Sequence, residues 1–319
     1  MSEDDLIARF FAPLAGAEGL GLLDDAALVS APPGHDLVIT CDALVAGVHF
    51  FENDPADTIA AKALRVNLSD LAAKGAKPRG FVLALALNKS DDAWLQAFAR
   101  GLKGDIDAFA FPLLGGDTVK TPGPLMISVT AFGLVPEGRM VPRTGARAGD
   151  LLYVSGTIGD AALGLLERQG AISAGQAGAH LVARYLHPEP RMGLAPALLN
   201  HAHAAMDISD GLIGDLTKMM RVSGVTAEVR LVDVPLSPAA TAVMGGDEAL
   251  FARAVSGGDD YEILASIAPE EAQAFERIAE AVGVSVTQIG HVLAGTSPPR
   301  FLDGNRQAVS FVSGSFSHF

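Results

Sequence analysis

The chain has 319 residues and a formal net charge of −14, from 23 basic and 37 acidic side chains. Apolar residues make up 49% of it, which excludes an intrinsically disordered protein, and the acidic balance argues against a charged surface for nucleic acid. Cys41 is the only cysteine, so an internal disulfide and a cysteine-rich zinc site are excluded. We find no uncharged apolar run of about 18 residues, and the acidic start MSEDD is unlike a secretion signal. These features predict a cytoplasmic protein of about two domains that binds neither membrane nor nucleic acid.

The first half of the chain is predicted to begin with a helix that Ser2 caps and whose apolar stripe runs from Leu6 to Leu14. A strand over residues 36–41 and a helix over residues 56–74 follow. Next come a buried strand over residues 81–87 and a helix that Ser90 caps and that runs to about residue 103. A short strand ends at residues 113–114, and another covers residues 125–135.

Turn residues crowd positions 136–145, and we place the domain boundary there, giving domains of residues 1–137 and 138–319. The second domain is predicted to contain strands over residues 151–155, 204–208, 226–232, 261–267 and 284–292. Helices cover residues 161–169 and 270–282, and another begins near Asp210. This alternation of strands and helices predicts α/β layers in both halves.

Aspartates recur beside glycine, serine, threonine or asparagine at predicted element ends. The six segments are LDDA (residues 23–26), TCD (40–42), NLSD (67–70), GGDT (115–118), DISDG (207–211) and GGDD (257–260). Asp42 and Asp117 each follow an apolar run typical of a strand, where loop residues tend to form sites. Carboxylates beside hydroxyl and carbonyl oxygens suit a hard divalent cation, and Mg²⁺ in particular adds substrate phosphates as ligands. The alternative is ordinary turns and caps: Asp210 would cap a helix that starts at Gly211, and Asp70 would lie on a solvated face.

The motifs that would assign a nucleotide enzyme directly are absent. The sequence has no GxxxxGK[ST] loop, no GxGxxG that opens a helix after a strand, no kinase HRD or DFG set, and no GxSxG elbow.

Read in order, the segments DDAA, TxDxLVxGVHF, NLSDLAAxGA, GGDT, DISDGL and SGGxDYE resemble the thiamine-monophosphate kinase family, which belongs to the aminoimidazole ribonucleotide synthetase superfamily. The resemblance covers essentially the whole chain. It implies an α/β fold of two domains, with an N-terminal domain that binds metal and ATP and pairs its sheet across a homodimer. A C-terminal α/β domain would close the cleft for ATP and substrate.

The resemblance also implies the reaction ATP + thiamine monophosphate → ADP + thiamine diphosphate, with several Mg²⁺ ions between the phosphate groups. Because the acceptor is already a phosphate oxygen anion, we expect no catalytic acid or base. The implied metal ligands are Asp25, Thr40, Cys41, Asp42, Asp70, Asp117, Asp207 and Asp210. The implied ATP contacts are Gly116, Asp117, Arg143 and Ser209, and the implied substrate contacts are His49, Asp259 and either Phe311 or Phe316.

Three positions depart from the pattern of the family. Leu23 replaces a glycine, Cys41 replaces a hydroxyl residue, so that its backbone carbonyl is the better ligand, and Asp259 replaces a glutamate. Three other readings remain. The chain is a sibling ATP-dependent enzyme that acts on another small molecule, a regulator that binds Mg-nucleotide without turnover, or a purely structural α/β protein whose aspartates form ordinary turns.

Overall fold

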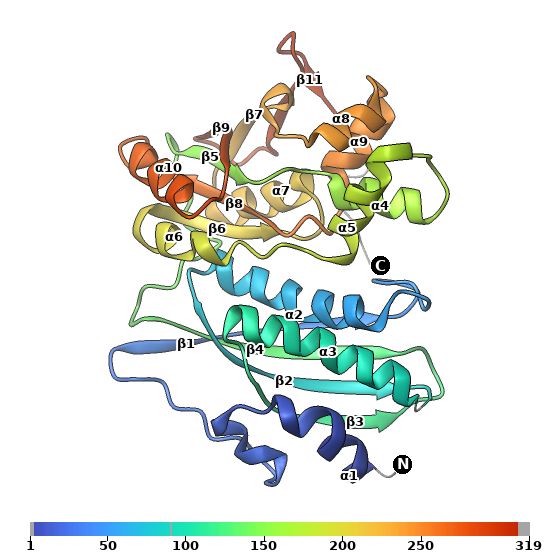
Figure 1. The fold of residues 1–319 in the computed structure, drawn as a ribbon. Helices are drawn as coiled ribbons and strands as arrows, with labels where there is room; N and C mark the ends of the chain where they lie inside the picture. Colours follow the sequence, from blue (N-terminus) through green and yellow to red (C-terminus); the bar gives the residue numbers. More distant parts are fainter. Residues whose placement is uncertain (1–2, 90, 312–319) are drawn as a thin grey trace. The chain divides into compact units, whose positions relative to one another are not determined.

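The structure is a computed structural model that describes residues 3–89 and 91–311. The chain divides into two compact units (Figure 1). The first unit contains the residues up to Leu71 together with Ala76–Arg139. The second contains Ala72–Gly75 and the residues from Met140 onward, so the last turn of one helix belongs to the second unit.

The first unit is built on a four-stranded sheet with the order β1-β4-β2-β3. Its strands are β1 (His35–Val45), β2 (Lys77–Leu87), β3 (Leu113–Lys120) and β4 (Met126–Pro136). Strands β2 and β3 are parallel, and the other neighbouring pairs are antiparallel. Alternate residues of β4, such as Ile127, Val129 and Ala131, are fully buried, while the residues between them are partly exposed. The sheet therefore has one face turned to the core and one face that is only partly covered.

Two long helices, α2 (Ala56–Ala73) and α3 (Asp92–Phe109), belong to this unit. Helix α2 is buried on almost all sides and is rich in alanine. Helix α3 is amphipathic and turns Leu95, Phe98 and Leu102 to the core. It begins at a different residue than expected: Asp91 is the N-cap and accepts from the backbone N–H groups of residues 93 and 94. Ser90 lies outside the described residues.

A buried ion pair joins the two helices, and we expect it to stabilise the first unit. Arg65 donates through Nε and a terminal nitrogen to the two carboxylate oxygens of Asp105, both at 2.8 Å. Asp105 is 3% exposed. An Asp105→Asn variant should lower the free energy of unfolding by about 2 kcal/mol, because a guanidinium with little solvent loses its charged partner.

Fluorescence of Trp94, the only tryptophan, reports on this unit during urea unfolding. The matched control is Asp107→Asn, which removes the exposed pair with Lys103 and should change stability by less than about 0.5 kcal/mol. Equal effects of the two variants would contradict a special role for the buried pair.

The N-terminal segment is helical, but it is not one regular helix. It runs through α1 (Glu3–Leu6), a π-helical turn (Ile7–Phe11) and a 3₁₀ turn (Ala12–Leu14) that contains a proline. A second 3₁₀ segment, Ala17–Leu22, packs beside β3. Phe10, Phe11 and Leu14 are buried, as the apolar stripe predicts. Ser2, the expected cap, lies outside the described residues.

Two strands are longer than expected. Strand β1 continues to Val45, and β3 begins at Leu113 where the sequence analysis had a strand end. Asp42 and Asp117 therefore lie within strands, and the prediction that they follow strands is wrong. The reason is that β1 and β3 are the two edges of the sheet, where a polar residue can keep its backbone pairing while its side chain reaches solvent.

The second unit is built on a seven-stranded sheet with the order β11-β10-β7-β9-β5-β8-β6. Its strands are β5 (Leu151–Ser155), β6 (Ala202–Ile208), β7 (Thr226–Arg230), β8 (Glu262–Ile267), β9 (Val286–Leu293), β10 (Arg300–Leu302) and β11 (Ala308–Val309). Its helices are α4 (Asp160–Arg168), α5 (Gly178–Leu186), α6 (Ala195–His201), α7 (Leu212–Ser223), α8 (Pro238–Met244), α9 (Glu248–Ser256) and α10 (Ala272–Ala281).

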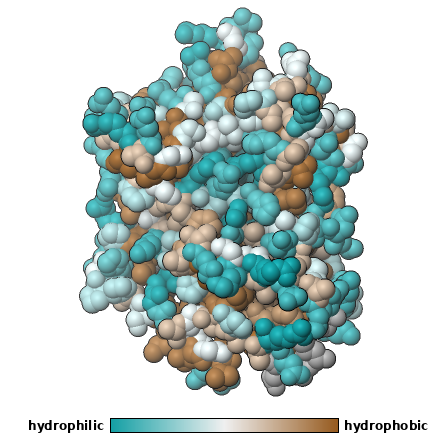
Figure 2. Space-filling model, viewed as in Figure 1, coloured by the Kyte–Doolittle hydropathy of each residue, from teal (hydrophilic) through white to brown (hydrophobic). Residues whose placement is uncertain are grey.

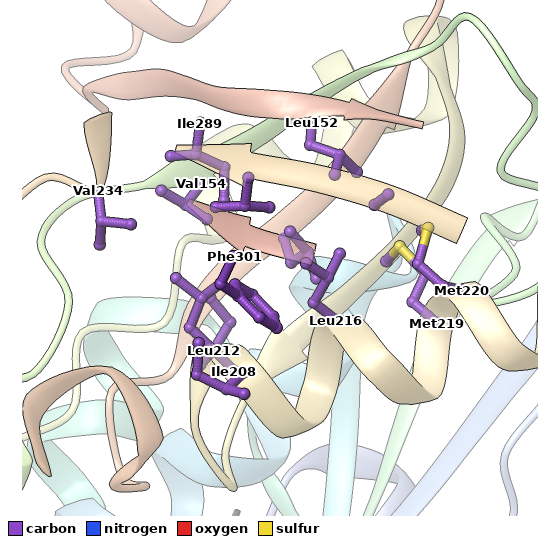
Figure 3. Close-up of a cluster of buried hydrophobic side chains, with 14 of the residues drawn as sticks. Leu152, Val154, Ile208, Leu212, Leu216, Met219, Met220, Val234, Ile289 and Phe301 are labelled. Carbon is purple, nitrogen blue, oxygen red and sulfur yellow. The ribbon is translucent and has the colours of Figure 1, made fainter. Parts of the chain in front are cut away.

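Hydrophobic clusters lie on both faces of this sheet. On one face Leu212, Leu216 and Met219 of α7 point toward β5 and β9 (Figure 3). On the other face residues of α6 and α10 pack with Tyr153 and its neighbours. Because adjacent residues of β5 go to opposite clusters, the strand is buried on both sides, as in an α/β domain. A third cluster joins α4, α5, α8 and α9.

No helix in the described part of the chain is both long enough and apolar enough to span a membrane. The face shown in Figure 2 mixes hydrophilic and hydrophobic residues, and brown atoms gather at its lower edge, where Figure 1 draws the N-terminal segment. In that segment Leu20, Leu23 and Leu28 are exposed.

Candidate functional site

A cavity of about 390 Å³ opens in the first unit between the N-terminal segment and strands β2 and β3. Asp24, Asp25 and Asp117 are among its lining residues, together with Gly115 and Gly116. Three carboxylates and two glycines therefore line one cavity. They come from two of the predicted segments, LDDA and GGDT, which the fold brings together. A lining that combines carboxylates with bare backbone suits a ligand whose negative charge is carried by metal ions.

The loop before these aspartates bends without a glycine at position 23. Leu23 has φ −103, so a side chain is accommodated there. The left-handed conformations fall instead on Leu20, Gly21 and Leu22. The Leu23 side chain is 92% exposed. The leucine that replaces the family's glycine therefore has no packing role within the chain.

A second group of predicted ligands lies where β1 meets α2. The Thr40 hydroxyl donates to Asp70 of α2. The backbone N–H of Asp42 donates to the side-chain oxygen of Asn67 at 3.2 Å, and the amide nitrogen of Asn67 in turn donates to the carbonyl of Ala63. Asn67 is completely buried, so its bond to the backbone fixes the position of Asp42 relative to α2. Asp70 is partly buried and bound, so the alternative of a freely solvated Asp70 is wrong.

The side chain of Cys41 points away from this group. Residues 40 and 42 lie on the face of β1 that α2 contacts, and the residue between them lies on the opposite face. There its sulfur is 3.4 Å from the Thr130 hydroxyl and 3.6 Å from that of Ser128. A thiol ligand at the Thr40–Asp42 group is thus not available, which agrees with the expectation that only the backbone carbonyl could serve.

His49 is held in a defined tautomer. Its Nδ1 accepts from the backbone N–H of Val45 at 3.0 Å, so in the neutral ring the proton is on Nε2, which can donate to a phosphate oxygen. The ammonium of Lys62, a residue only 2% exposed, donates to the carbonyl of His49 at 3.1 Å. Lys62 was not predicted from the sequence motifs.

The two groups lie at opposite edges of the sheet. Strands β4 and β2 separate β1 from β3, so Asp42 and Asp117 stand three strand spacings apart, about 14 Å across the strands.

Among residues 3–89 and 91–311, no three His, Cys, Asp or Glu side chains converge closely enough to hold a metal by themselves. Mg²⁺ binds through one or two carboxylates and takes phosphates for the rest, so these small donor sets fit Mg-nucleotide better than a bare ion.

In the second unit, the loop after β5, the loop after β6 and the loop before β8 meet at the same end of these strands. Strand β8 is antiparallel to both β5 and β6, so the carboxyl ends of β5 and β6 and the start of β8 lie together. Two backbone bonds join the loops: Asp259 N–H donates to the Ser209 carbonyl at 2.9 Å, and Tyr261 N–H to the Ile208 carbonyl at 2.8 Å. The DISDG and GGDD segments are therefore neighbours in space, with Asp207 almost completely buried at the end of β6.

The GGDD loop has an unusual backbone. Asp259 and Tyr261 both have positive φ, 72° and 51°, which is rare for residues other than glycine. Between them Asp260 is buried and accepts from the Gly159 N–H with both oxygens, at 2.9 and 3.0 Å. Burial raises the pKa of Asp260 well above its usual value, against the effect of the Gly159 bond. The Tyr261 hydroxyl contacts the Asp259 carboxylate at 3.2 Å. Strain of this kind, held by a buried anchor, is typical of a binding loop.

Asp210 does not cap a helix. Helix α7 starts at Leu212 after Gly211, which makes no side-chain cap, so the capping alternative is wrong. Instead Lys218 donates to Asp210 and to Asp215, the latter at 3.0 Å. Burial raises the pKa of Asp215, while the charge of Lys218 opposes the rise. Neither Asp215 nor Lys218 was predicted. The sequence held a signal for Asp215, because a carboxylate among the buried apolar residues of a helix needs a polar partner.

The remaining predicted contacts are Arg143, Phe311 and Phe316. Arg143 lies exposed in the loop that begins the second unit. Phe311 packs against the core of the second unit, with its ring edge-on to Phe301 at 5.7 Å between centroids. Phe316 lies outside the described residues.

Comparisons with known proteins match both halves of the chain. Residues 23–135 match the model of the AIR synthase related protein, N-terminal domain, and residues 147–300 match the corresponding C-terminal domain. The thiamine-monophosphate kinase of Caulobacter vibrioides is 47% identical over 95% of this chain and 87% of its own length. This chain belongs to the thiamine-monophosphate kinase family. The resemblance and the fold class predicted from the sequence motifs are confirmed.

Solved structures of the family superpose closely. The thiamine-monophosphate kinase of Stenotrophomonas maltophilia matches with a TM-score of 0.82 and 39% identity over 90% of this chain and 91% of that one. AaThiL complexed with AMPPCP and TMP matches with a TM-score of 0.80 and 29% identity over 93% of this chain and 91% of that one. The chain is therefore an enzyme of a kinase family.

Proposed function

We propose that the chain transfers the γ-phosphoryl group of ATP to the phosphate of thiamine monophosphate, releasing ADP and thiamine diphosphate. The observation that carries the proposal is the cavity of the first unit, in which Asp24, Asp25 and Asp117 lie beside Gly115 and Gly116. Support comes from relatives that are named for this activity and from a related chain complexed with AMPPCP and TMP.

Positioning, rather than acid–base chemistry, accounts for the rate in this proposal. The residues that would hold Mg²⁺ are Asp25, Asp42, Asp70, Asp117 and the pair Asp207/Asp210, with the Thr40 hydroxyl and the Cys41 carbonyl beside them. Mg²⁺ bound there would supply positive charge against the phosphate groups, so that the chain can bring them into line. The acceptor oxygen is already an anion, so no side chain has to remove a proton. The protein, at −14, needs this metal to bring two polyanions together.

The chain's own residues then bind and orient the two substrates. Gly116 and Ser209 offer backbone or hydroxyl donors to ATP, and Arg143 offers a guanidinium. Nε2 of His49 donates to the acceptor phosphate. The strained loop that presents Asp259 binds the cationic part of thiamine monophosphate, where the shorter carboxylate is supported by the Tyr261 hydroxyl. Of the two candidate aromatics, Phe311 and Phe316, one would stack on the substrate.

We infer further that two copies of the chain complete each site. Asp42 and Asp117 lie at opposite edges of the four-stranded sheet, too far apart to share an ion. A two-fold axis that sets the β1 edge of one copy beside the β3 edge of the other makes neighbours of the two strands that carry these aspartates. The partly covered sheet face, with Leu37, Ile39 and Met126 exposed, would become the interior of this homodimer.

An ADP-release assay tests the proposal. The chain is given Mg-ATP with thiamine monophosphate, with thiamine or with no acceptor. ADP should form quickly only with the monophosphate, together with an equal amount of thiamine diphosphate. ADP formation with a different acceptor would instead indicate a sibling enzyme. Binding of Mg-ATP, seen as a rise in melting temperature, without ADP formation would indicate a regulator.

A further inference from the structure

Lys218 and Asp215 of helix α7 both bind Asp210, one through its side chain and the other through its backbone. Lys218 donates to the Asp210 carboxylate and, at 3.0 Å, to one oxygen of Asp215. The other oxygen of Asp215 accepts from the backbone N–H groups of Ser209 and Asp210, at 3.1 and 2.9 Å. One ammonium is therefore shared by two carboxylates, and both the backbone and the side chain of Asp210 are fixed by residues one turn apart on one helix.

The two carboxylates are not equivalent. Asp215 is completely buried and accepts three hydrogen bonds through its two oxygens, so it is tied to the protein on both sides and has no open path to a metal ion from solvent. The Asp210 side chain keeps 36% of its surface exposed, and that of Lys218 keeps 33%. Of the two, only Asp210 can change partners without leaving a buried charge uncompensated.

We propose that Lys218 is the built-in counter-ion of Asp210 and that a divalent cation binds at Asp210 by displacing the Lys218 ammonium. Lys218 keeps its bond to Asp215 when it is displaced, so the ammonium is never left unpaired. Asp215 is then a positioning residue that holds the Ser209–Asp210 turn in place in both states. This inference rests on the proposed metal role of Asp210.

The sign of the expected effect separates this role from a purely structural one. A structural lysine would loosen the site when removed and so weaken metal binding. A displaced counter-ion competes with the metal, so its removal tightens binding. For a partly exposed pair the competition amounts to a two- to fivefold change, about the strength of a surface ion pair.

The test measures binding of Mn²⁺ with AMPPCP to the full chain, without thiamine monophosphate, by titration calorimetry, so that the nucleotide supplies the phosphate ligands that the small donor sets lack. Lys218→Met should bind Mn²⁺ about two- to fivefold more tightly at one site. Lys218→Arg keeps the charge and should resemble the parent chain. Lys103→Met, which removes an exposed ammonium paired with Asp107 in the first unit, is the matched control and should have no effect.

A double-mutant cycle assigns the effect to Asp210. In an Asp210→Asn background, Lys218→Met should leave Mn²⁺ binding unchanged. Weaker or equal binding in the single variant, or an effect that persists without Asp210, would overturn the proposal. If Lys218→Met does not fold, the Asp215→Asn/Lys218→Met pair removes both charges and keeps an amide oxygen for the Ser209–Asp210 turn. Because no turnover is measured, failure of the kinase proposal would appear separately, as a parent chain that binds Mn²⁺ but forms no ADP.

Discussion

Asp42→Asn should lower kcat by about a thousandfold or more while the fold stays intact. The substitution removes a charge that is proposed to hold Mg²⁺, and it changes the side-chain volume very little. The strand should not move, because the backbone N–H of Asp42 remains bonded to the buried Asn67 and β1 remains paired with β4. Turnover is measured by ADP release, and the fold by the unfolding midpoint.

Asp36→Asn is the control on the same strand. Asp36 is exposed and accepts from the Gly138 N–H, far from the proposed ligands. Its replacement should leave kcat within about twofold of the parent chain. Near-normal turnover in Asp42→Asn would mean that this carboxylate does not hold a metal.

Mixing two inactive variants tests whether each site spans two copies. Asp117→Asn should be as inactive as Asp42→Asn. If each site takes Asp42 from one copy and Asp117 from the other, a mixed dimer has one intact site, and full exchange restores about a quarter of the parent activity. A mixture that stays inactive after exchange would indicate that each chain forms its own site.

Gly116→Ala should have the second large effect, on stability. Gly116 pairs with Leu83 across β2 and β3, and an added Cβ would stand 2.0 Å from the Leu83 carbonyl oxygen. Backbone cannot yield as a flexible side chain can, so we expect the first unit to lose about 3 kcal/mol or more of unfolding free energy. Urea unfolding followed through Trp94 measures the loss.

Its neighbour supplies the matched control. A Cβ on Gly115 would come no closer than 3.8 Å to the Val82 side chain, so Gly115→Ala should fold with a loss below about 1 kcal/mol. Gly115 also lines the cavity, and a methyl group there should weaken ATP binding by about tenfold if phosphate approaches the bare backbone. A stable Gly116→Ala chain, or a Gly115→Ala chain that unfolds, would contradict the strand register.

The fold class followed from the sequence because buried strands leave apolar runs and amphipathic helices leave stripes. Strand ends were harder, since the edge strands β1 and β3 continue through polar residues whose pairing depends on backbone alone. Several short helices of the second unit were also missed. Two of them had readable caps, Ser237 before Pro238 for α8 and Asp247 for α9, which accept from backbone N–H groups two or three residues onward.

The site was predictable to the extent that local motifs carry it. The sequence indicated which aspartates matter, and the structure shows which of them lie near one another: Asp25 with Asp117 in the cavity, and the Thr40–Asp42 group beside Asp70. Strand order cannot be read from local patterns, so the separation of the two groups to opposite edges was not foreseen. The supporting residues, Asn67, Asp215 and Lys218, were missed because their role depends on partners in other segments or on helix geometry.

The most direct test of the central claim follows the transferred phosphate itself. The chain is incubated with Mg²⁺, thiamine monophosphate and ATP labelled with ³²P at the γ-position. The account predicts that the label appears in the terminal phosphate of thiamine diphosphate, one for each ADP formed. Label released as inorganic phosphate, with thiamine monophosphate unchanged, would contradict direct transfer and the proposed function with it.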